Sequence, residues 1–186
     1  MSTYIIKGGN KLEGNVTISG SKNAALPIIA ATILNSGITF LYNVPEIQDT
    51  KLMFEILICL GAKVKKINNK FKIDTSSIRK FEIPDDLMCK IRSSILFAGS
   101  LIGRYGNVIL TYPGGCDIGT RPIDLHLKGF EKLGVKINKN FGKIECSCDK
   151  LIGKKIYLDF PSVRSNWKYN VIFSFCWRHN CYFKCS

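Results

Sequence analysis

Two copies of one sequence pattern lie in this chain, and the repeat limits the folds that are open to it. The segment LGAKV that begins at Leu60 recurs as LGVKI at Leu133, 73 residues later. In both copies we expect the same order of elements: helix, strand, helix and hairpin. Because self-similarity at a fixed offset is typical of folds assembled from one repeated unit, the sequence predicts an α/β domain built from copies of this unit.

Hydrophobic periodicity and turn residues predict the elements of the first copy. They are a helix over 21–35, a strand over 38–44, a helix ending at Gly61, and a hairpin of 63–67 and 71–74. Asp49 is expected to cap the second helix. Residues 1–20 have the pattern of short strands separated by glycine turns.

The second copy follows a helix that we expect to run from Pro84-Asp85 to Ile102. Its predicted elements are a strand over 107–111, a helix over 123–133 and a hairpin of 135–138 and 143–146. A third copy is expected to begin at Lys155.

One loop differs in length between the two copies. Gly37 and Gly61 lie 24 residues apart, whereas Gly106 and Gly134 lie 28 apart, so the second copy is four residues longer. The extra length falls in the loop at Gly114–Gly119. An insertion at one loop of one copy is where a scaffold usually carries function.

That loop belongs to the segment TYPGGCDIGTRPIDLH, residues 111–126. Cys116 lies on it, and Arg121 precedes the start of the predicted helix. A positive field lowers the pKa of a thiol, and arginines and helix N-termini bind phosphate oxygens. The spacing alone leaves two interpretations open, a reactive thiol beside an anion site or a small core cysteine after an ordinary turn.

Charge favours an anionic partner. The chain has 27 Lys and Arg against 14 Asp and Glu, a formal net charge of +13. The lysines are scattered singly, and the sequence contains no long basic block or aromatic stacking motif of an RNA-binding module. We therefore expect a phosphate-bearing small molecule and no nucleic acid as partner.

Cysteine spacing and hydropathy suggest the compartment. None of the eight cysteines forms a CxxC pair, so we expect no metal site and no cofactor. The N-terminal sequence does not read as a signal peptide, and no apolar run approaches the length of a membrane span. A cytoplasmic protein with reduced thiols and no membrane association is the expectation.

Two motifs together resemble the UDP-N-acetylglucosamine 1-carboxyvinyltransferase family of enolpyruvyl transferases. PGGC-x-IG-x-RP-x-DLH matches the catalytic loop of that family, and SGSKNAALP at 19–27 matches a segment upstream. The shikimate-pathway enolpyruvyl transferases share the fold but lack the PGGC loop, so Cys116 discriminates between the two groups. The resemblance covers about residues 1–163.

The resemblance implies an inside-out α/β barrel domain of the enolpyruvyl transferase type, built from repeated units with the helices packed centrally. Residues 21–163 would form an incomplete N-terminal domain of two repeats and the start of a third. Residues 1–20 would be strands belonging to a second domain that is missing here.

The reaction implied is the transfer of enolpyruvyl from phosphoenolpyruvate to the 3-hydroxyl of UDP-N-acetylglucosamine, the first committed step of peptidoglycan synthesis. By resemblance, Cys116 is the proton donor, forms a covalent adduct with phosphoenolpyruvate and is alkylated by fosfomycin. Lys22 would contact phosphoenolpyruvate with Asn23 beside it, and Arg121 would bind the phosphate. From the residues alone, the preferred interpretation of Lys22 and Asn23 is a capped, solvated helix start.

Further ligand contacts follow from the same resemblance. Arg92, in KIRSSIL, would bind from its helix, although a mid-helix arginine is most often a surface residue. Ser162 and Val163 match a segment near the diphosphate, and His126 is expected to order the loop. The residues implied to line the uridine side are Arg121, Pro122, Ile123, Asp124 and Leu125.

Two features argue against turnover by this chain. The family's aspartate base and a further arginine lie in the second domain, so we expect an inactive product; the alternative is a non-catalytic or nucleotide-sugar binding fragment. From Arg164 the composition also changes, with both tryptophans and no acid in 164–186. A one-base frameshift near residue 164 would explain that segment, and a naturally divergent tail is the alternative.

Overall fold

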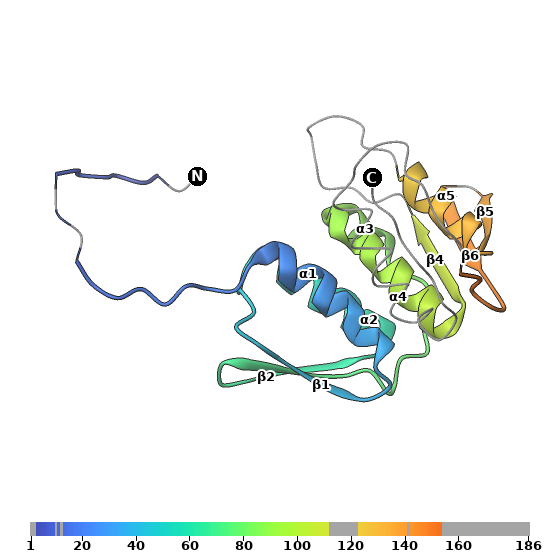
Figure 1. Cartoon of the computed structure of the whole chain (residues 1–186), viewed down its shortest axis with the longest axis horizontal. Coiled ribbons are helices and arrows are strands. Elements are labelled where there is room, and N and C mark those ends of the chain that lie inside the picture. Colours follow the sequence, from blue (N-terminus) through green and yellow to red (C-terminus); the bar gives the residue numbers. More distant parts are fainter. Residues whose placement is uncertain (1–2, 10, 12, 112–122, 141, 154–186) are drawn as a thin grey trace.

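The structure is a computed structural model that describes residues 3–9, 11, 13–111, 123–140 and 142–153 (Figure 1). The elements of the first half are α1 (Lys22–Ala31), η1 (Thr32–Leu34), β1 (Ile38–Tyr42), α2 (Gln48–Leu60), β2 (Lys63–Ile67) and β3 (Lys70–Asp74). Those of the second half are α3 (Asp85–Lys90), η2 (Arg92–Ile95), α4 (Leu96–Tyr105), β4 (Asn107–Thr111), α5 (Asp124–Lys132), β5 (Lys136–Asn140) and β6 (Lys143–Ser147). No helix in these ranges combines the length and the apolar character that crossing a bilayer requires.

Each half contains one β-α-β-β unit with the same topology. Both sheets have three antiparallel strands, in the orders β1-β3-β2 and β4-β6-β5. Equivalent residues lie 69 apart in the first strand (Ile38 and Asn107) and 73 apart in the second (Lys63 and Lys136). The predicted repeat is confirmed, and the four extra residues lie between β4 and the end of α5.

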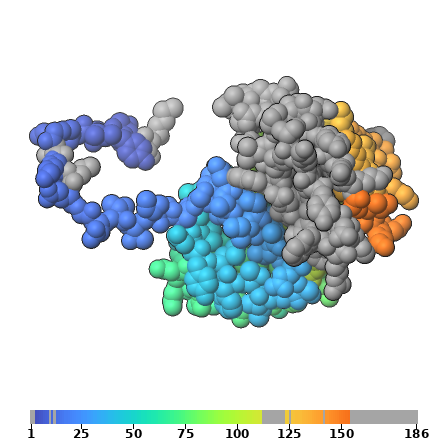
Figure 2. Space-filling view, in the orientation of Figure 1, coloured from blue at the N-terminus to red at the C-terminus, as the bar shows by residue number. Residues whose placement is uncertain are grey.

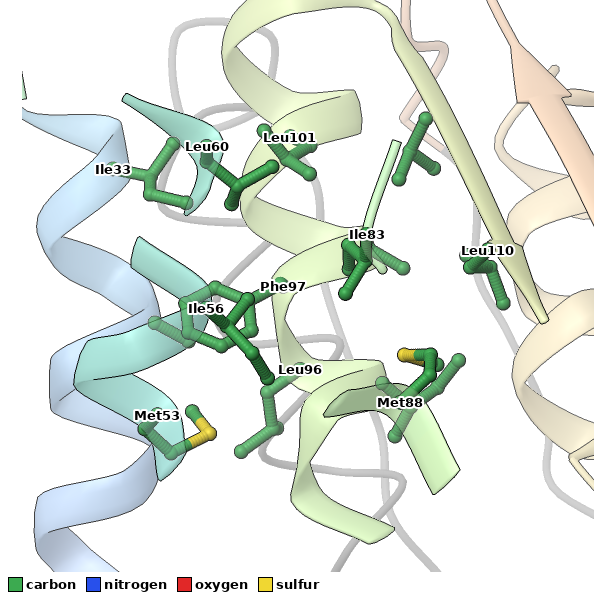
Figure 3. Close-up of a cluster of buried hydrophobic side chains, with 14 of the residues drawn as sticks. Ile33, Met53, Ile56, Leu60, Ile83, Met88, Leu96, Phe97, Leu101 and Leu110 are labelled. Carbon is green, nitrogen blue, oxygen red and sulfur yellow. The ribbon is translucent and has the colours of Figure 1, made fainter. Parts of the chain in front are cut away.

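Helices from both halves share one hydrophobic core. α1 packs against α2 and α4, and α2 also contacts α3 and η2. Figure 3 shows side chains of these helices converging around Phe97, with Ile56 of α2 and Leu96 beside it. Phe97, Met53 and Ile56 have no exposed surface. At about 2–3 kcal/mol for each fully buried large apolar side chain, this packing outweighs any propensity of the separate helices.

α1 and α4 run in the same direction. Arg104 in the last turn of α4 donates from Nη1 to the carbonyl of Ile33, 2.8 Å away, at the end of the helical segment that follows α1. The same atom lies 3.2 Å from the carbonyl of Thr75. Because one guanidinium satisfies carbonyls from two segments, the C-terminal ends of α1 and α4 are held together, and their N-termini lie at the opposite end.

The single helix predicted from Pro84 to Ile102 is wrong in one respect, because Ile91 interrupts it. This residue has extended backbone angles (φ −143°, ψ 127°) between α3 and η2. The Ile91 carbonyl accepts from the backbone N–H of Ser94 at 3.3 Å and from the buried Ser94 hydroxyl at 2.6 Å, so a new helical turn starts here. The apolar periodicity continues through the break, and for that reason the sequence pattern did not reveal it.

The predicted cap of α2 is also wrong. Ile47 is the N-cap residue, and its backbone N–H donates to Thr50 Oγ1 at 3.3 Å. Thr50 is the third residue of α2, and its hydroxyl lies 2.7 Å from the Pro45 carbonyl. This side chain therefore stabilises the turn that leads into the helix. Asp49 lies inside the first turn, where its charge favours the helix dipole without capping.

The short strands predicted over residues 1–20 do not form in the part of this segment that the structure describes. Tyr4, Ile6 and Val16 are each at least 85% exposed, and the segment extends away from the folded body (Figure 2). An extended segment becomes a strand only when a neighbouring strand supplies backbone hydrogen bonds. That residues 1–20 pair with a second domain stays a prediction.

Gly106, which joins α4 to β4, is expected to be intolerant of a side chain. It has φ 69°, and an added Cβ would lie 2.4 Å from the Cys148 carbonyl oxygen. Gly106→Ala should therefore lower the free energy of unfolding by about 2 kcal/mol or more in urea denaturation. Gly37 occupies the matching place before β1, and a Cβ added there would have no neighbouring atom within 4 Å. Gly37→Ala should therefore change the free energy of unfolding by less than about 1 kcal/mol. Equal effects of the two substitutions would contradict this account.

Candidate active site at the helix N-termini

Most of the predicted ligand residues that the structure describes lie in the first turn of a helix. Lys22 and Asn23 begin α1, Arg92 begins η2 and Asp124 begins α5. The first N–H groups of a helix have no partner within it and carry a partial positive charge. A cationic side chain in such a turn adds to that field, so the starts of α1 and η2 are suited to an anion.

An ion pair fixes the start of α1 against the start of α2. The ammonium of Lys22 contacts the carboxylate of Asp49, and their side chains are 50% and 30% exposed. Ion pairs with this exposure contribute about 1 kcal/mol or less to folding. The main consequence of the pair is therefore positional: it holds the Lys22 ammonium beside the first turns of two parallel helices.

Arg92 reaches the same end of the helical layer because of the break at Ile91. Without that break Arg92 would lie in the middle of a helix, with its backbone N–H bonded within it. Instead it is the half-buried first residue of η2, which contacts α2. Since α2 also supplies Asp49, the structure connects Lys22 and Arg92 through one shared element.

The residues predicted to line the uridine side belong to the other unit. Ile123 is 4% exposed and Asp124 is exposed, both at the start of α5, and Leu125 follows within that helix. Figure 1 shows α5 across β4 from α1, so the described structure does not bring these residues together with Lys22. His126 is buried, and its backbone N–H donates to the Ile123 carbonyl at 2.8 Å.

Several predicted residues lie outside the described residues. They are Cys116, Arg121, Pro122, Ser162 and Val163, together with the expected third repeat and the 164–186 segment. The Cys116 segment joins the last residue of β4 to the first turn of α5.

The four cysteines that the structure describes differ in exposure, from the buried Cys146 to the exposed Cys89. Cys59 and Cys89 lie in helices and Cys146 in a strand, as the sequence predicted, and all are free thiols. Burial raises the pKa of Cys146 from 9.0 to about 12, and burial also raises the pKa of Cys148. Thiols with raised pKa values are poor nucleophiles at neutral pH, because the thiolate is the reactive form.

Sequence reasoning missed two features of the site. Asp49 was assigned a capping role, whereas it pairs with Lys22 across two helices. Arg92 was placed in mid-helix, whereas it begins a new helical segment. The adjacent serines at 93 and 94 were the available signal for the break, because a serine hydroxyl competes with the backbone for helical carbonyls.

A sequence profile described as EPSP synthase (3-phosphoshikimate 1-carboxyvinyltransferase) matches residues 6–173. This match covers both repeated units and ends within the 164–186 segment.

Curated relatives agree with each other in name. "UDP-N-acetylglucosamine 1-carboxyvinyltransferase 2" of Caldanaerobacter subterraneus subsp. tengcongensis is 47% identical over 163 residues, which are 88% of this chain and 39% of that protein. "UDP-N-acetylglucosamine 1-carboxyvinyltransferase 1" of Clostridium acetobutylicum is 48% identical over 165 residues, 88% of this chain and 40% of that protein. The chain thus spans about 40% of the length of the relatives that it matches.

Solved structures confirm the predicted fold class. The enolpyruvyl transferase NikO from Streptomyces tendae superposes with a TM-score of 0.73 at 23% identity, covering 89% of this chain and 39% of that one. EPSP synthase from Acinetobacter baumannii gives 0.66 at 18% identity, covering 86% and 38%. At these identities the likeness shows the fold: an incomplete domain of the enolpyruvyl transferase type.

The buried Cys146 thiol should remain unreactive in the folded chain, whereas the exposed Cys89 should react with iodoacetamide at pH 7.5. Peptide mass spectrometry after pulse alkylation measures both. Because the pKa of Cys146 is higher in the folded state, the unfolded chain loses this proton first, and the free energy of unfolding should fall as pH rises from about 9 to about 12. Cys146→Ala should reduce that pH dependence. Equal alkylation of Cys89 and Cys146 in the folded chain would show that the Cys146 thiol is accessible and would contradict its burial.

Proposed function

The chain belongs to the EPSP synthase (3-phosphoshikimate 1-carboxyvinyltransferase) family, and from that premise we propose that it serves the transfer of enolpyruvyl from phosphoenolpyruvate to the 3-hydroxyl of UDP-N-acetylglucosamine. The observation that carries this choice of substrate is the 47% identity to relatives named for that reaction. The PGGC loop agrees with it, because the shikimate-pathway enzymes that share the fold lack this cysteine. The step would be a cytoplasmic one that opens peptidoglycan synthesis.

Chemically, the reaction is an addition followed by an elimination. The sugar hydroxyl oxygen adds to the central carbon of phosphoenolpyruvate while the methylene carbon accepts a proton, which gives a tetrahedral intermediate. Phosphate then leaves, the new methyl group returns a proton, and the enolpyruvyl ether remains. The site must therefore hold phosphate and carboxylate by cations, supply a proton donor and remove the hydroxyl proton.

Lys22 and Arg92 would provide the cationic part within the described structure. Lys22 lies at the start of α1 in contact with Asp49, and Arg92 lies at the start of η2, which packs on α2. Phosphoenolpyruvate carries its phosphate and carboxylate close together, and helix starts with basic side chains suit such a multiply charged anion. Asn23 would contribute an amide beside Lys22.

Residues of the loop and of the second unit complete the proposal. Cys116 would donate the proton to the methylene carbon and form the covalent adduct, and Arg121 would bind the phosphate. The uridine side would be lined by Arg121, Pro122, Ile123, Asp124 and Leu125. Ser162 and Val163 would lie near the diphosphate.

Ligand binding and turnover are expected to depend on different parts of the family's proteins. In the family, the aspartate base and a further arginine come from a second domain, and the chain spans about 39% of the relatives' length. We therefore expect this chain to bind ligands without completing the reaction. A non-catalytic or nucleotide-sugar binding fragment is the second candidate, favoured by that same short span.

Replacing Lys22 tests the anion site with a matched control. Lys22→Met and Asp49→Asn both remove the same ion pair, but only Lys22→Met removes the cation. Binding of phosphoenolpyruvate in the presence of UDP-N-acetylglucosamine should weaken about 10- to 100-fold in Lys22→Met, as expected for a lost charge-assisted hydrogen bond. Asp49→Asn should retain binding within about threefold. Calorimetric titration measures both.

The rate of Cys116 alkylation by fosfomycin gives an independent measure in the same variants. It should fall in Lys22→Met and persist in Asp49→Asn. Equal losses in the two variants would mean that the ion pair acts structurally and that Lys22 does not contact the ligand.

Turnover by the 186-residue chain is expected to be absent. With both substrates supplied, phosphate release should equal that of a Cys116→Ala control, because the groups that activate the sugar hydroxyl are not among the residues proposed here. A coupled phosphate assay, with mass spectrometry of the nucleotide sugar, measures this. Sustained release with formation of the enolpyruvyl ether would refute the expectation.

A further inference from the structure

The outer edge of β1 lacks the features that normally protect a sheet edge. Exposed edge strands invite pairing with other strands, and proteins usually block them with lysines, prolines or covering segments. Two of the other sheet edges, β2 (KVKKI) and β5 (KINKN), carry lysines along their length. β1 reads ITFLY and contains no charge, no proline and no glycine.

The equivalent edge of the second unit is covered by the chain itself. Ile109 in β4 donates its N–H to the Phe81 carbonyl at 2.8 Å, and Ile83 donates to the Ile109 carbonyl at 3.1 Å. Residues 81–83 therefore run as a parallel bridge along β4. Phe40 is the matching residue of β1, and within the described ranges no segment forms a ladder there.

The backbone of β1 presents alternate residues to this open edge. The Gly37 carbonyl accepts from Thr75 N–H on the β3 side, at 3.1 Å. The Ile38 carbonyl accepts from the Asn35 side-chain amide at 3.3 Å. Because successive residues of a strand direct their N–H and C=O groups to opposite sides, Ile38, Phe40 and Tyr42 are the residues that direct theirs away from β3.

The side chains of the same three residues form an exposed apolar row. Ile38, Phe40 and Tyr42 are 50%, 45% and 67% exposed. The equivalent residues of β4 are Asn107, Ile109 and Thr111, of which two are polar. Within the described residues, the two units thus differ at this strand. Two of the three residues are polar in β4, where the edge is covered, and none of the three is charged or small in β1, where the edge is open.

We propose that β1 is a self-association surface, where two copies of the chain pair antiparallel, β1 against β1, about a two-fold axis at Phe40. Phe40 would then exchange backbone hydrogen bonds with Phe40 of the second copy. Ile38 would lie opposite Tyr42, a pairing of β-branched and aromatic side chains that stabilises antiparallel sheets. The strand is apolar at both ends and at its centre, so it is complementary to itself under this symmetry.

Charge explains why a second copy fits this edge better than the other edges. The chain carries a net charge of +13, so copies repel one another in general. Pairing through β2 would bring Lys63, Lys65 and Lys66 of the two copies close together. β1 itself carries no lysine. Its neighbours across the β3 pairing are Lys72, opposite Phe40, and Lys70, opposite Tyr42. The Lys70 Nζ lies over the Phe40 ring, 4.8 Å from its centre.

Two contacts mark the ends of the open edge. The Asn35 amide occupies one side of the Ile38 carbonyl, and Gly20 N–H donates to Asn43 Oδ1 at 3.1 Å just beyond Tyr42. A carbonyl accepts two hydrogen bonds, so the Asn35 contact does not block strand pairing. The interface is short, and we expect a weak dimer whose population depends on concentration.

Sedimentation velocity from micromolar to submillimolar protein tests the proposal. The mass should rise from that of one chain to that of two. Phe40→Lys, which places two ammonium groups at the axis, should keep the chain monomeric over this range. Ile67→Lys adds a lysine to the same face of the same sheet, on the lysine-bearing strand β2, and should leave dimerisation unchanged.

A second variant tests the backbone directly. Phe40→Pro removes an N–H that faces away from β3, a substitution that edge strands accept, and it should also abolish the dimer. Circular dichroism shows whether each variant is folded. If Phe40→Pro does not fold, the oligomeric state of Phe40→Lys alone tests the proposal. A monomer at every concentration would overturn the proposal. So would a dimer that persists in Phe40→Lys, or a monomer whose β1 amides resist hydrogen exchange because the chain's own N-terminal segment covers them.

Discussion

The parallel packing of α1, α2 and α4 is the constraint on which the rest of the structure depends. Arg104 joins the ends of α1 and α4, and the Lys22–Asp49 pair joins the starts of α1 and α2. Because the helices share one direction, their unsatisfied N–H groups and positive dipole ends accumulate at one end of the core. The anion site proposed here follows from that arrangement, with Lys22 and Arg92 adding full charges to the partial charges of the backbone.

Duplication supplies the framework of the described structure, and the two copies differ in two respects. Both units have the same strand order, yet the second has four more residues between its first strand and the end of its helix. Cys116 lies in the sequence between that strand and that helix. The copies also differ at the open edge of the first strand, which residues 81–83 cover only in the second unit. Differences of this kind stand out because the rest of the unit gives a direct internal comparison.

Much of this fold was predictable from the sequence, because periodicity and glycine positions specify helices, strands and their order. The repeat at Leu60 and Leu133 predicted the topology, and the family resemblance implied Lys22 and Arg92 as ligand residues, which stays a prediction. The features that escaped prediction are tertiary. The break at Ile91 keeps the apolar period of an unbroken helix, and the role of Asp49 depends on a partner 27 residues away in sequence, at Lys22. The described part of residues 1–20 forms no strand, because strand formation depends on a partner that local sequence does not specify.

Amide chemical shifts under phosphate titration test the central claim most directly. If the helix starts form one anion site, the amide resonances of Lys22, Asn23 and Arg92 in the isotope-labelled chain should move together and fit a single dissociation constant. Resonances of the exposed lysines on β2 should move little over the same range. Shifts that are confined to those surface lysines, or separate constants for the starts of α1 and η2, would contradict a shared site.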